Sequence, residues 1–293
     1  MLAFSFDEQE SLLKIAIEIL EDYNVQSWSF GGGTALSVLY YNHRMSYDID
    51  IFSEDFSGIT SLIENQKEIA ANLGISTSQI QASPSGITFI ISQEKHQLKL
   101  DFLYSQPLTR TPYVTKNILG QENIKVQTAF EIIAKKLKYR YILTIRDFVD
   151  FAYAENKDKI ISKIKDSGIL DIERFIDVWR QFDSISEEDF NLELQYLNPI
   201  FMTSKQCIYS SLFVAFNPKD YVDIAINEVN ELLSFDSWIE ELRDDYESIG
   251  EYNIYEKIPK NAIATILNKN SLVITYGDIY NLANEQVKEL LKI

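Results

Sequence analysis

The sequence predicts a mixed α/β (or α+β) N-terminal half followed by a helical C-terminal half. Strand-like and helix-like patterns alternate up to about residue 110, and helical periodicity dominates from Thr128 onward. The length of 293 residues also exceeds the roughly 150 residues typical of one domain. We therefore expect two domains, 1–125 and 126–293, with the helical domain completing the cleft of the first.

The elements of the N-terminal half follow from local patterns. Apolar side chains recur every three or four residues in 8–23, which predicts an amphipathic helix. A short strand over 27–30 leads into the turn Gly31–Thr34, and a helix over 35–41 and a strand over 46–52 follow. A second helix is expected over 59–73, with Gly74 at its C-terminal cap.

The middle and C-terminal segments change from strands to helices. Residues 87–92 and 97–103 have the pattern of two strands joined by a polar turn at 93–96. The segment 107–112, bounded by prolines, interrupts regular structure. Helices are then expected over 128–142, 146–156, 158–165, 171–181, 186–193 and 219–247.

Composition and charge exclude several classes of protein. With 27 basic and 44 acidic residues the net charge is −17, which argues against non-specific binding of long duplex DNA but allows a small basic cleft. The single Cys207 excludes an intrachain disulfide and a cysteine-built zinc site. Because we find no apolar run of membrane-spanning length and no basic N-terminal leader, we expect a soluble cytoplasmic protein.

Three aspartates predict a metal site. Asp48 and Asp50 are two residues apart in a predicted strand and therefore project from the same face. Such a like-charge pair is costly unless a cation lies between them, and Mg²⁺ binds through carboxylates together with substrate phosphates. Asp101 lies on the less apolar face of another strand and would supply a third ligand for phosphoryl transfer. Taken alone, an Asp-x-Asp pair is more often a solvated strand face.

Two further segments carry phosphate-binding character. The turn Gly31–Thr34, which includes Gly32 and Gly33, can bring backbone N–H groups against a phosphate, although it could simply be a tight turn. Residues 135–146 hold five basic side chains and no acid, and Lys136 and Arg140 align on one helix face. An ordinary solvated helix face is the alternative explanation for this basic segment.

The combination of these motifs resembles the AbiEii/AbiGii (MenT-like) family of nucleotidyltransferase toxins. The motifs are GGTAL, HRMSYDIDIF, KLDFL and AKKLKYR followed by RDFVDF, in the family's order across roughly residues 28–155. The resemblance implies a polymerase-beta-type core with a small mixed sheet, an NTP donor and Mg²⁺. It also implies a role in abortive infection (phage defence) or in a toxin–antitoxin pair, with a cognate antitoxin as partner.

The resemblance also implies site residues. Gly33 and Thr34 match the phosphate loop, Asp48 and Asp50 the metal-binding pair, and Asp101 the third carboxylate. Lys136 matches the lysine that contacts the triphosphate, and the RDxxD element supplies Arg146, Asp147 and Asp150. Which of these last two aspartates faces the nucleotide is left open. Arg44 and Ser46 either reach the nucleotide or brace the loop, and His43 is expected to organise its turn.

The sequence leaves three functions open. The leading one is Mg²⁺-dependent transfer of NMP from an NTP to an RNA 3′ hydroxyl, which would block translation or growth, and the family resemblance implies the tRNA acceptor end as the acceptor. The second is NMP transfer to a protein hydroxyl, which the sequence cannot separate from the first. The third is a catalytically idle module that binds nucleotide or antitoxin, and the presence of every expected carboxylate and of the lysine argues against it. A separate acidic segment, 228–256, carries many carboxylates against Arg243 alone and reads as a solvated helix face.

Overall fold

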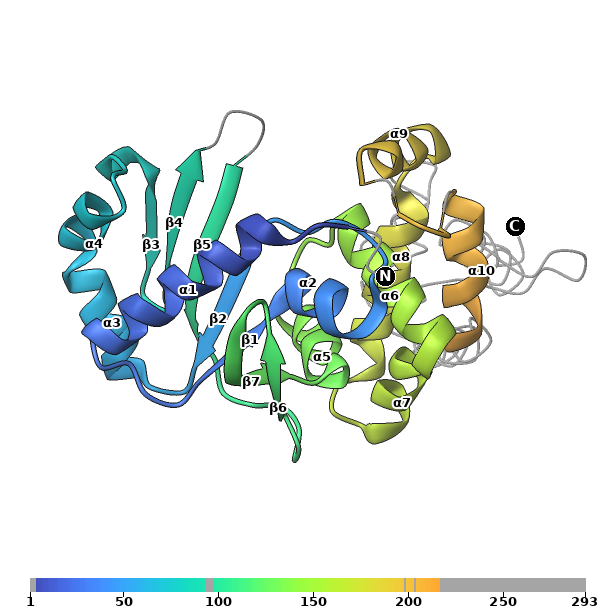
Figure 1. The fold of residues 1–293 in the computed structure, drawn as a ribbon. Helices are drawn as coiled ribbons and strands as arrows, with labels where there is room; N and C mark the ends of the chain where they lie inside the picture. The colour runs from blue at the N-terminus through green and yellow to red at the C-terminus, as the bar shows by residue number, and fades with distance from the viewer. Residues whose placement is uncertain (1–3, 93–96, 198, 203, 217–293) are drawn as a thin grey trace, which may run out of the picture. The chain divides into compact units, whose positions relative to one another are not determined.

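The computed structural model describes residues 4–92, 97–197, 199–202 and 204–216 (Figure 1). The strands are β1 (Trp28–Gly31), β2 (Ile49–Ser53), β3 (Ile80–Ser83), β4 (Gly86–Ser92), β5 (Gln97–Tyr104), β6 (Tyr113–Ile118) and β7 (Gln121–Gln127). The helices of the sheet-bearing part are α1 (Asp7–Asp22), α2 (Gly32–Ala35), the π-helix η1 (Leu36–Tyr41), α3 (Phe56–Glu64), α4 (Gln66–Asn72) and the short 3₁₀ turn η2 (Thr77–Gln79). From residue 129 onward they are α5 (Ala129–Tyr139), α6 (Ile145–Asp158), α7 (Ile160–Ser167), α8 (Ile172–Ser184), α9 (Glu187–Leu197) and α10 (Lys205–Phe216).

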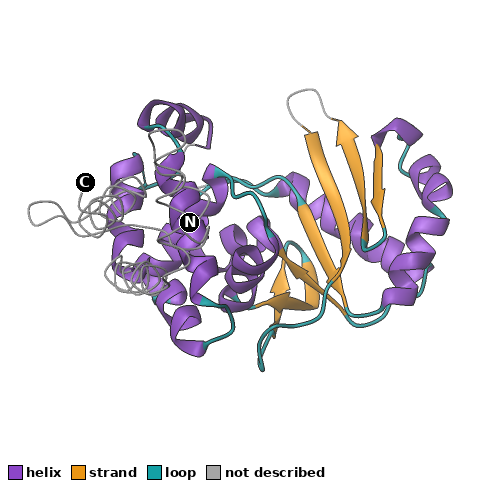
Figure 2. Ribbon diagram, turned by 180° about the vertical axis from the view of Figure 1, so that it is seen from behind, coloured by secondary structure: helices purple, strands orange, loops and turns teal. Residues whose placement is uncertain are grey.

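The strands form one mixed seven-stranded sheet in the order β3-β4-β5-β2-β1-β7-β6 (Figure 2). The pairs β2–β5 and β1–β7 are parallel, and the remaining neighbours are antiparallel. The described residues after β7 form helices α5 to α10. This arrangement confirms the predicted mixed α/β class with helices following the sheet.

The two faces of the central strands differ in character. On one face Ile49 and Ile51 of β2 and Leu100 and Phe102 of β5 are buried, and α1 and α3 pack against the sheet (Figure 1). Because side chains alternate along a strand, Asp50 and its neighbours project from the opposite face. The same alternation that builds the core therefore assembles the polar site on the other side of β2.

Most predicted elements are present, with several differences. The helix expected over 59–73 is two helices that meet at Asn65, whose side-chain amide donates to the Ser61 carbonyl. Gly74 has φ +67° and directly follows Leu73, the capping residue of α4. The predictions omitted β3, β6, β7 and α10. The helix expected over 219–247, the turn at 93–96 and the acidic segment 228–256 lie outside the described residues.

The chain divides into two compact units. Of the described residues, the first comprises those up to Ile169 together with Ser186–Ser211, and the second comprises Leu170–Ile185 and Leu212–Phe216. The sheet and helices α1 to α7 belong to the first unit, so α5 and α6 share a unit with the sheet. The domain boundary expected after residue 125 stays a prediction. No helix in the described ranges has both the length and the apolar character of a membrane span.

Candidate active site

Strand register brings the three predicted carboxylates to one place. Asp50 of β2 and Asp101 of β5 are direct partners in the parallel ladder, and Asp48 immediately precedes β2. Burial, with added repulsion from Asp101 and Asp48, raises the pKa of Asp50 to about 7. Burial also raises the pKa of Asp101, although a hydrogen bond from Thr88 opposes this and Asp48 adds to it. Asp50 and Asp101 therefore favour a bound proton or cation.

The donor chemistry of this cluster fits a hard divalent cation, because every donor is a carboxylate oxygen. Among the described residues, however, no group of three or more His, Cys, Asp or Glu side chains is arranged to hold one ion as it stands. Arg146 lies within ion-pair distance of Asp48, with its Nη1 3.9 Å from Oδ2. The predicted metal ligands stay a prediction.

The glycine turn lies against these carboxylates. Gly32 has φ +69°, and a Cβ there would lie 1.8 Å from Asp50 Oδ2. A Cβ on Gly33 would lie 2.7 Å from Arg44 Nη2. The buried Thr34 donates its hydroxyl hydrogen to the carbonyl of Asp48, which ties the turn to the start of β2. Only glycine fits at Gly32, because any side chain would collide with the carboxylate.

A buried cluster of ionic groups lies next to the turn, centred on Asp150 of α6. Arg44 grips its carboxylate through Nε and Nη2 at 2.8 and 2.9 Å. His43 Nε2 lies 2.7 Å from Oδ1, and Lys136 Nζ donates to Oδ2 at 2.7 Å. Although burial raises the pKa of Asp150, Arg44 and Lys136 together hold it well below its ordinary value. Burial lowers the pKa of His43, so its ring is neutral and donates to the carboxylate.

Asp147 is the second carboxylate of the cluster. It accepts hydrogen bonds from Lys136 Nζ at 2.9 Å and from Arg140 Nη1 at 2.7 and 2.8 Å. It also caps α6 by accepting from the backbone N–H and the hydroxyl of Thr144. Burial opposes ionisation, but Lys136 and Arg140 lower its pKa below the ordinary value. Lys136 is thus fixed between Asp147 and Asp150, and three cations against two carboxylates leave one positive charge in excess.

Some of the predicted site residues are buried and hold the loop or the ionic cluster in place, whereas Arg146 is partly exposed. Arg44 is buried and donates hydrogen bonds to Asp150 and to the Met45 carbonyl. Ser46 is also buried, and its carbonyl accepts a hydrogen bond from Gln9 Nε2. In this structure both brace the loop, and a direct nucleotide contact by either stays a prediction. Arg146 remains 42% exposed. Asp147 and Asp150 are fully buried and bonded to cations, so neither is open to solvent.

A cavity of about 170 Å³ opens between the polar face of β2 and helix α5. Its lining residues come from both sides of that gap and are Gly32, Asp50, Phe52, Leu103, Ser105, Gln127, Ile132, Lys135, Lys136, Tyr139 and Arg140. The wall formed by α5 is fixed by the buried Glu131, which accepts from the backbone N–H of Leu108 and Thr109 and pairs with Lys135 at 3.3 Å. The carboxylate Asp50 and the cations Lys136 and Arg140 therefore share one cavity.

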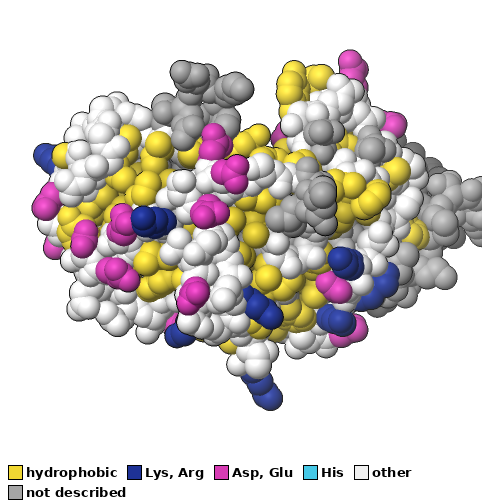
Figure 3. Space-filling view, viewed as in Figure 1, with side chains coloured by type: hydrophobic (Ala, Val, Ile, Leu, Met, Phe, Trp, Pro, Cys, Tyr) yellow, Lys and Arg dark blue, Asp and Glu magenta, His cyan; other side chains and the backbone are white. Residues whose placement is uncertain are grey.

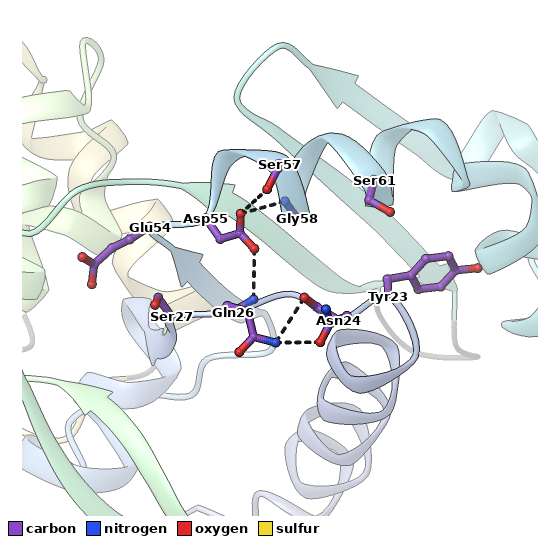
Figure 4. A pocket seen from close by; sticks show the side chains of 9 residues that line it. All are labelled: Tyr23, Asn24, Gln26, Ser27, Glu54, Asp55, Ser57, Gly58 and Ser61. Atoms are coloured by element: carbon purple, nitrogen blue, oxygen red, sulfur yellow. Dashed lines mark hydrogen bonds between the residues drawn. The ribbon is translucent and has the colours of Figure 1, made fainter.

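A larger pocket of about 560 Å³ lies at the other end of β1 and β2 (Figure 4). Its polar groups bond to one another: Asp55 accepts from Ser57 Oγ, from the Gly58 N–H and from the Gln26 N–H. The described residues that line it include two carboxylates and no Lys, Arg or His. This pocket would repel phosphates, so we place the site at the cavity beside Asp50.

Sequence reasoning missed Thr88 and Gln127 as contributors to the site. Thr88 donates to Asp101 from the neighbouring strand β4, a contact that depends on strand register. Gln127 lines the cavity from β7, a strand that the patterns did not predict. Arg140 was predicted to share a helix face with Lys136 in the basic segment, but it was not assigned to the site.

Carboxylates on neighbouring strands, with a glycine turn and a fixed lysine beside them, are the arrangement of a phosphoryl-transfer enzyme of the nucleotidyltransferase class. The sequence identifies the family more narrowly. The family model described as "Nucleotidyl transferase AbiEii toxin, Type IV TA system" matches residues 19–200. Since this match covers more than half of the chain, the chain belongs to the AbiEii family of nucleotidyltransferase toxins, and its reaction class is NTP-dependent nucleotidyl transfer.

Solved structures show more distant likenesses. A nucleotidyltransferase candidate from H. pylori is 15% identical, with 73% of this chain and 95% of that chain covered and a TM-score of 0.45. JHP933 from Helicobacter pylori is 16% identical over 74% and 94% of the two chains, with a TM-score of 0.42. The antibiotic-resistance factor ANT(2'')-Ia is 13% identical over 52% and 86%, with a TM-score of 0.33. No curated protein sequence matches the chain, and the family assignment rests on the sequence match alone.

Proposed function

We propose that this toxin transfers NMP from an NTP to the 3′ hydroxyl of an RNA, with the tRNA acceptor end as the favoured substrate and Mg²⁺ as the cofactor. The observation that carries the proposal is the position of Lys136. It is held by Asp147 and Asp150 at 2.9 and 2.7 Å and lines the same cavity as Asp50. A fixed cation beside a carboxylate cluster is suited to stabilising charge on a transferring phosphate.

Each group of the site has a part in the proposed reaction. Asp48, Asp50 and Asp101 would hold Mg²⁺, which when bound neutralises charge on the donor phosphates. The backbone N–H groups of Gly33 and Thr34 would face the triphosphate, and Lys136 with Arg140 would stabilise the negative charge of the leaving pyrophosphate. Asp101 would orient the acceptor hydroxyl and accept its proton. Asp147 and Asp150 act through Lys136 and are positioning residues.

Surface side chains beside the site favour RNA as the acceptor. The segment that joins α5 to α6 exposes Tyr141 and Ile142 to 88% and 75%, and Lys138 and Arg146 flank them. An exposed aromatic ring such as Tyr141, with cations near it in the sequence, is suited to stacking an unpaired base and contacting phosphates. On the face shown in Figure 3, basic side chains are scattered among acidic ones, which fits binding of an RNA end rather than a long duplex.

The test is to incubate the protein with each α-labelled NTP, Mg²⁺, total RNA and total protein. We expect label in the RNA fraction, and its loss in Asp48→Ala and Lys136→Ala. The matched controls are Asp22→Ala and Lys116→Ala, which remove exposed charges outside the site and should transfer at the wild-type rate.

Each alternative has its own signature in this assay. Label in protein instead of RNA would show that the acceptor is a protein hydroxyl. No label with any NTP would indicate an idle binding module. The toxin role is tested separately by inducing wild type and Asp48→Ala in cells, since only the wild type should arrest growth. Release of that arrest by co-expression of the adjacent upstream gene would support a cognate antitoxin.

A further inference from the structure

An apolar groove of about 300 Å³ lies between α1 and α4, on the side of the sheet away from Asp50. Its lining residues come from α1, α4, their C-terminal caps and β4, and are Ile15, Glu18, Ile19, Asp22, Tyr23, Ile69, Asn72, Leu73 and Ile91. Along β4, Ile91 shares a face with the buried Phe89, whereas Thr88 projects from the opposite face and bonds to Asp101. A molecule bound in this groove therefore does not cover the cavity beside Asp50.

The floor of the groove is built from two apolar pairs. Ile15 and Ile19 are four residues apart on α1, so they lie one turn apart on one face of the helix. Ile69 and Leu73 have the same spacing at the C-terminal end of α4. Ile69 is fully buried, but Ile15 and Leu73 are only half-buried and leave apolar surface open. Two such pairs are suited to receive apolar side chains that a helix presents one turn apart.

The α1 side of the groove is strongly acidic. Glu18 and Asp22 line it, Glu21 lies between them, and the last turn of α1 holds no basic side chain. Because the C-terminal end of a helix already carries partial negative charge, carboxylates there add repulsion. Lys14 lies 3.9 Å from Glu18, but both side chains are exposed and such pairs contribute little. Among the described residues no Lys or Arg forms an ion pair with Asp22. This end of the groove therefore favours positive charge.

The acidic character continues on both sides of Tyr23. Burial and the charges of Glu68 and Asp22 raise the pKa of the Tyr23 phenol, so carboxylates of α4 and of α1 both lie near the ring. Tyr23 also lines the larger pocket drawn in Figure 4, where Glu54 and Asp55 supply two more carboxylates. On the side of the molecule that carries α1, α3 and α4, Figure 3 shows acidic side chains bordering exposed hydrophobic ones. The groove is thus an apolar floor within an acidic surface.

Size and charge together limit the occupant. The volume of about 300 Å³ is at the lower end of the roughly 300–1,000 Å³ of small-molecule sites, so the groove takes one or two apolar side chains. The acidic rim repels RNA phosphates and anionic lipid head groups. It also repels a second copy of this chain, whose net charge is −17. A basic protein segment is the occupant that satisfies both the rim and the floor.

We propose that the groove between α1 and α4 docks a basic amphipathic helix of a partner protein. Two apolar side chains of the partner, one turn apart, fill the groove, and Lys or Arg side chains on either side of them lie beside Asp22 and Glu68. The inference is independent of the proposed reaction, because none of the residues that line the groove belongs to the site beside Asp50.

The first test varies the probe and needs no mutation. Three synthetic alanine-rich helical peptides are titrated against the full-length chain by fluorescence polarisation. One carries two leucines four residues apart between lysines, the second has glutamates in place of the lysines, and the third has serines in place of the leucines. We expect the first to bind at least about tenfold more tightly than the other two and to lose affinity as salt rises. No binding of the first peptide, or equal binding of the lysine and glutamate peptides, would overturn the proposal.

The second test changes the groove. Asp22→Lys should weaken binding of the lysine peptide at least about tenfold, whereas Glu122→Lys, an exposed charge reversal on β7, should leave it unchanged. Ile15→Ser should weaken it about tenfold, whereas Leu192→Ser, at an exposed position of α9, should not.

Asp22→Lys places a cation at the C-terminal end of α1 and should keep the fold, so it decides the question if Ile15→Ser does not fold. Thermal unfolding checks each variant. Unchanged affinity for the lysine peptide in folded Asp22→Lys would contradict the proposal.

Other occupants have distinct signatures. Displacement of the lysine peptide by a single-stranded RNA, or binding to phosphatidylserine vesicles that Ile15→Ser abolishes, would assign the groove to a different ligand and overturn the proposal. A dimer of the full-length chain that Ile15→Ser dissociates would do the same in favour of a second copy. A chain that binds the lysine peptide as expected but transfers no label would overturn the proposed reaction and leave the docking groove supported.

Discussion

Asp50 destabilises the folded protein when it is ionised, and it is also a proposed ligand of the metal ion. Its pKa is raised from 3.8 to about 7 by burial and by the charges of Asp101 and Asp48. The folded protein therefore binds a proton at this site more tightly than the unfolded chain does. Without metal, this group makes the free energy of unfolding fall as pH rises from about 4 to about 7. A site that is costly when empty and ionised is suited to take up a cation.

We expect Asp50→Asn to raise the thermal midpoint of the metal-free protein at pH 8 and to change it little at pH 5. The variant removes a repelling charge that is present only at the higher pH. The measurement is thermal unfolding in EDTA at both values, with Asp22→Asn as the exposed control. A midpoint that changes by the same amount at pH 8 as at pH 5 would show that Asp50 has no such charge in the folded state.

The carboxylates that contact Lys136 behave oppositely to Asp50, because Asp147 and Asp150 have lowered pKa values and are stabilised in their ionised form. We expect Lys136→Met to cost about 3 kcal/mol of stability, since it leaves two buried carboxylates with less compensation. The double variant with Asp147→Asn should recover part of that loss. Urea unfolding of both single variants and the double variant measures the coupling energy, and strict additivity would argue against the ion pair.

The loss of stability at low pH should depend on the same buried cluster of Asp147 and Asp150. A carboxylate with a lowered folded pKa contributes stability that is present above its unfolded pKa and lost as pH falls through the folded value. Asp147 and Asp150 both belong to this class. We therefore expect the free energy of unfolding to fall steeply below about pH 4, and less steeply in Asp147→Asn, in chemical denaturation followed across pH 2 to 6.

At the scale of elements, the glycine turn and helix α2 hold the site together. Gly32 and Gly74 have nearly the same positive φ, +69° and +67°. A Cβ on Gly32 would strike Asp50, whereas a Cβ on Gly74 would meet nothing within 4 Å. An alanine would therefore suffer similar backbone strain at either position, but only at Gly32 would its Cβ also collide with the carboxylate.

We expect Gly74→Ala to cost about 1–2 kcal/mol of stability and to leave transfer unchanged, because it adds strain alone. Gly32→Ala should cost more and abolish nucleotidyl transfer, since Asp50 must move. Thermal unfolding and the labelled transfer assay measure the two effects. Equal activity of the two variants would mean that the turn has no direct bearing on the carboxylates.

The strands also show which parts of the fold and the site could be predicted from local sequence patterns. The alternation around Asp50 and Asp101 predicted both strands and the polar face, because one side of each strand is buried. Strands β6 and β7 were missed, since buried and exposed residues do not alternate cleanly along either of them. Gln127 could not be found for that reason. The ladder that pairs Asp50 with Asp101, and Thr88 with Asp101, is a long-range property that no local pattern encodes.

For the whole molecule, the net charge of −17 does not show that acidic and basic side chains occupy different places with different proposed roles. The described acids include the carboxylates of the site, and the cations Lys138 and Arg146 flank the exposed Tyr141. Because single-stranded binding loses about 0.7 in log affinity per log salt for each phosphate neutralised, two such cations give a slope of only about −1.4. We expect weak binding of bulk RNA with this shallow slope in filter binding from 50 to 200 mM salt.

The matched variants for this prediction are Lys138→Ala with Arg146→Ala against Lys14→Ala with Lys116→Ala. The first pair should weaken RNA binding and flatten the salt slope, because it removes the cations next to the site. The second pair removes as much charge from exposed positions elsewhere and should bind as the wild type does. Equal loss in both pairs would point to net charge rather than a local surface.

Labelled nucleotide transfer is the measurement that tests the central claim most directly. The full-length protein is incubated with α-labelled NTPs, Mg²⁺ and tRNA, and nuclease digestion maps the label on the RNA. The account predicts label at the 3′ terminal position, with loss of at least a hundredfold in rate for Lys136→Met and Asp50→Asn. Transfer at the wild-type rate by folded Lys136→Met, or label that appears only in protein, would contradict it.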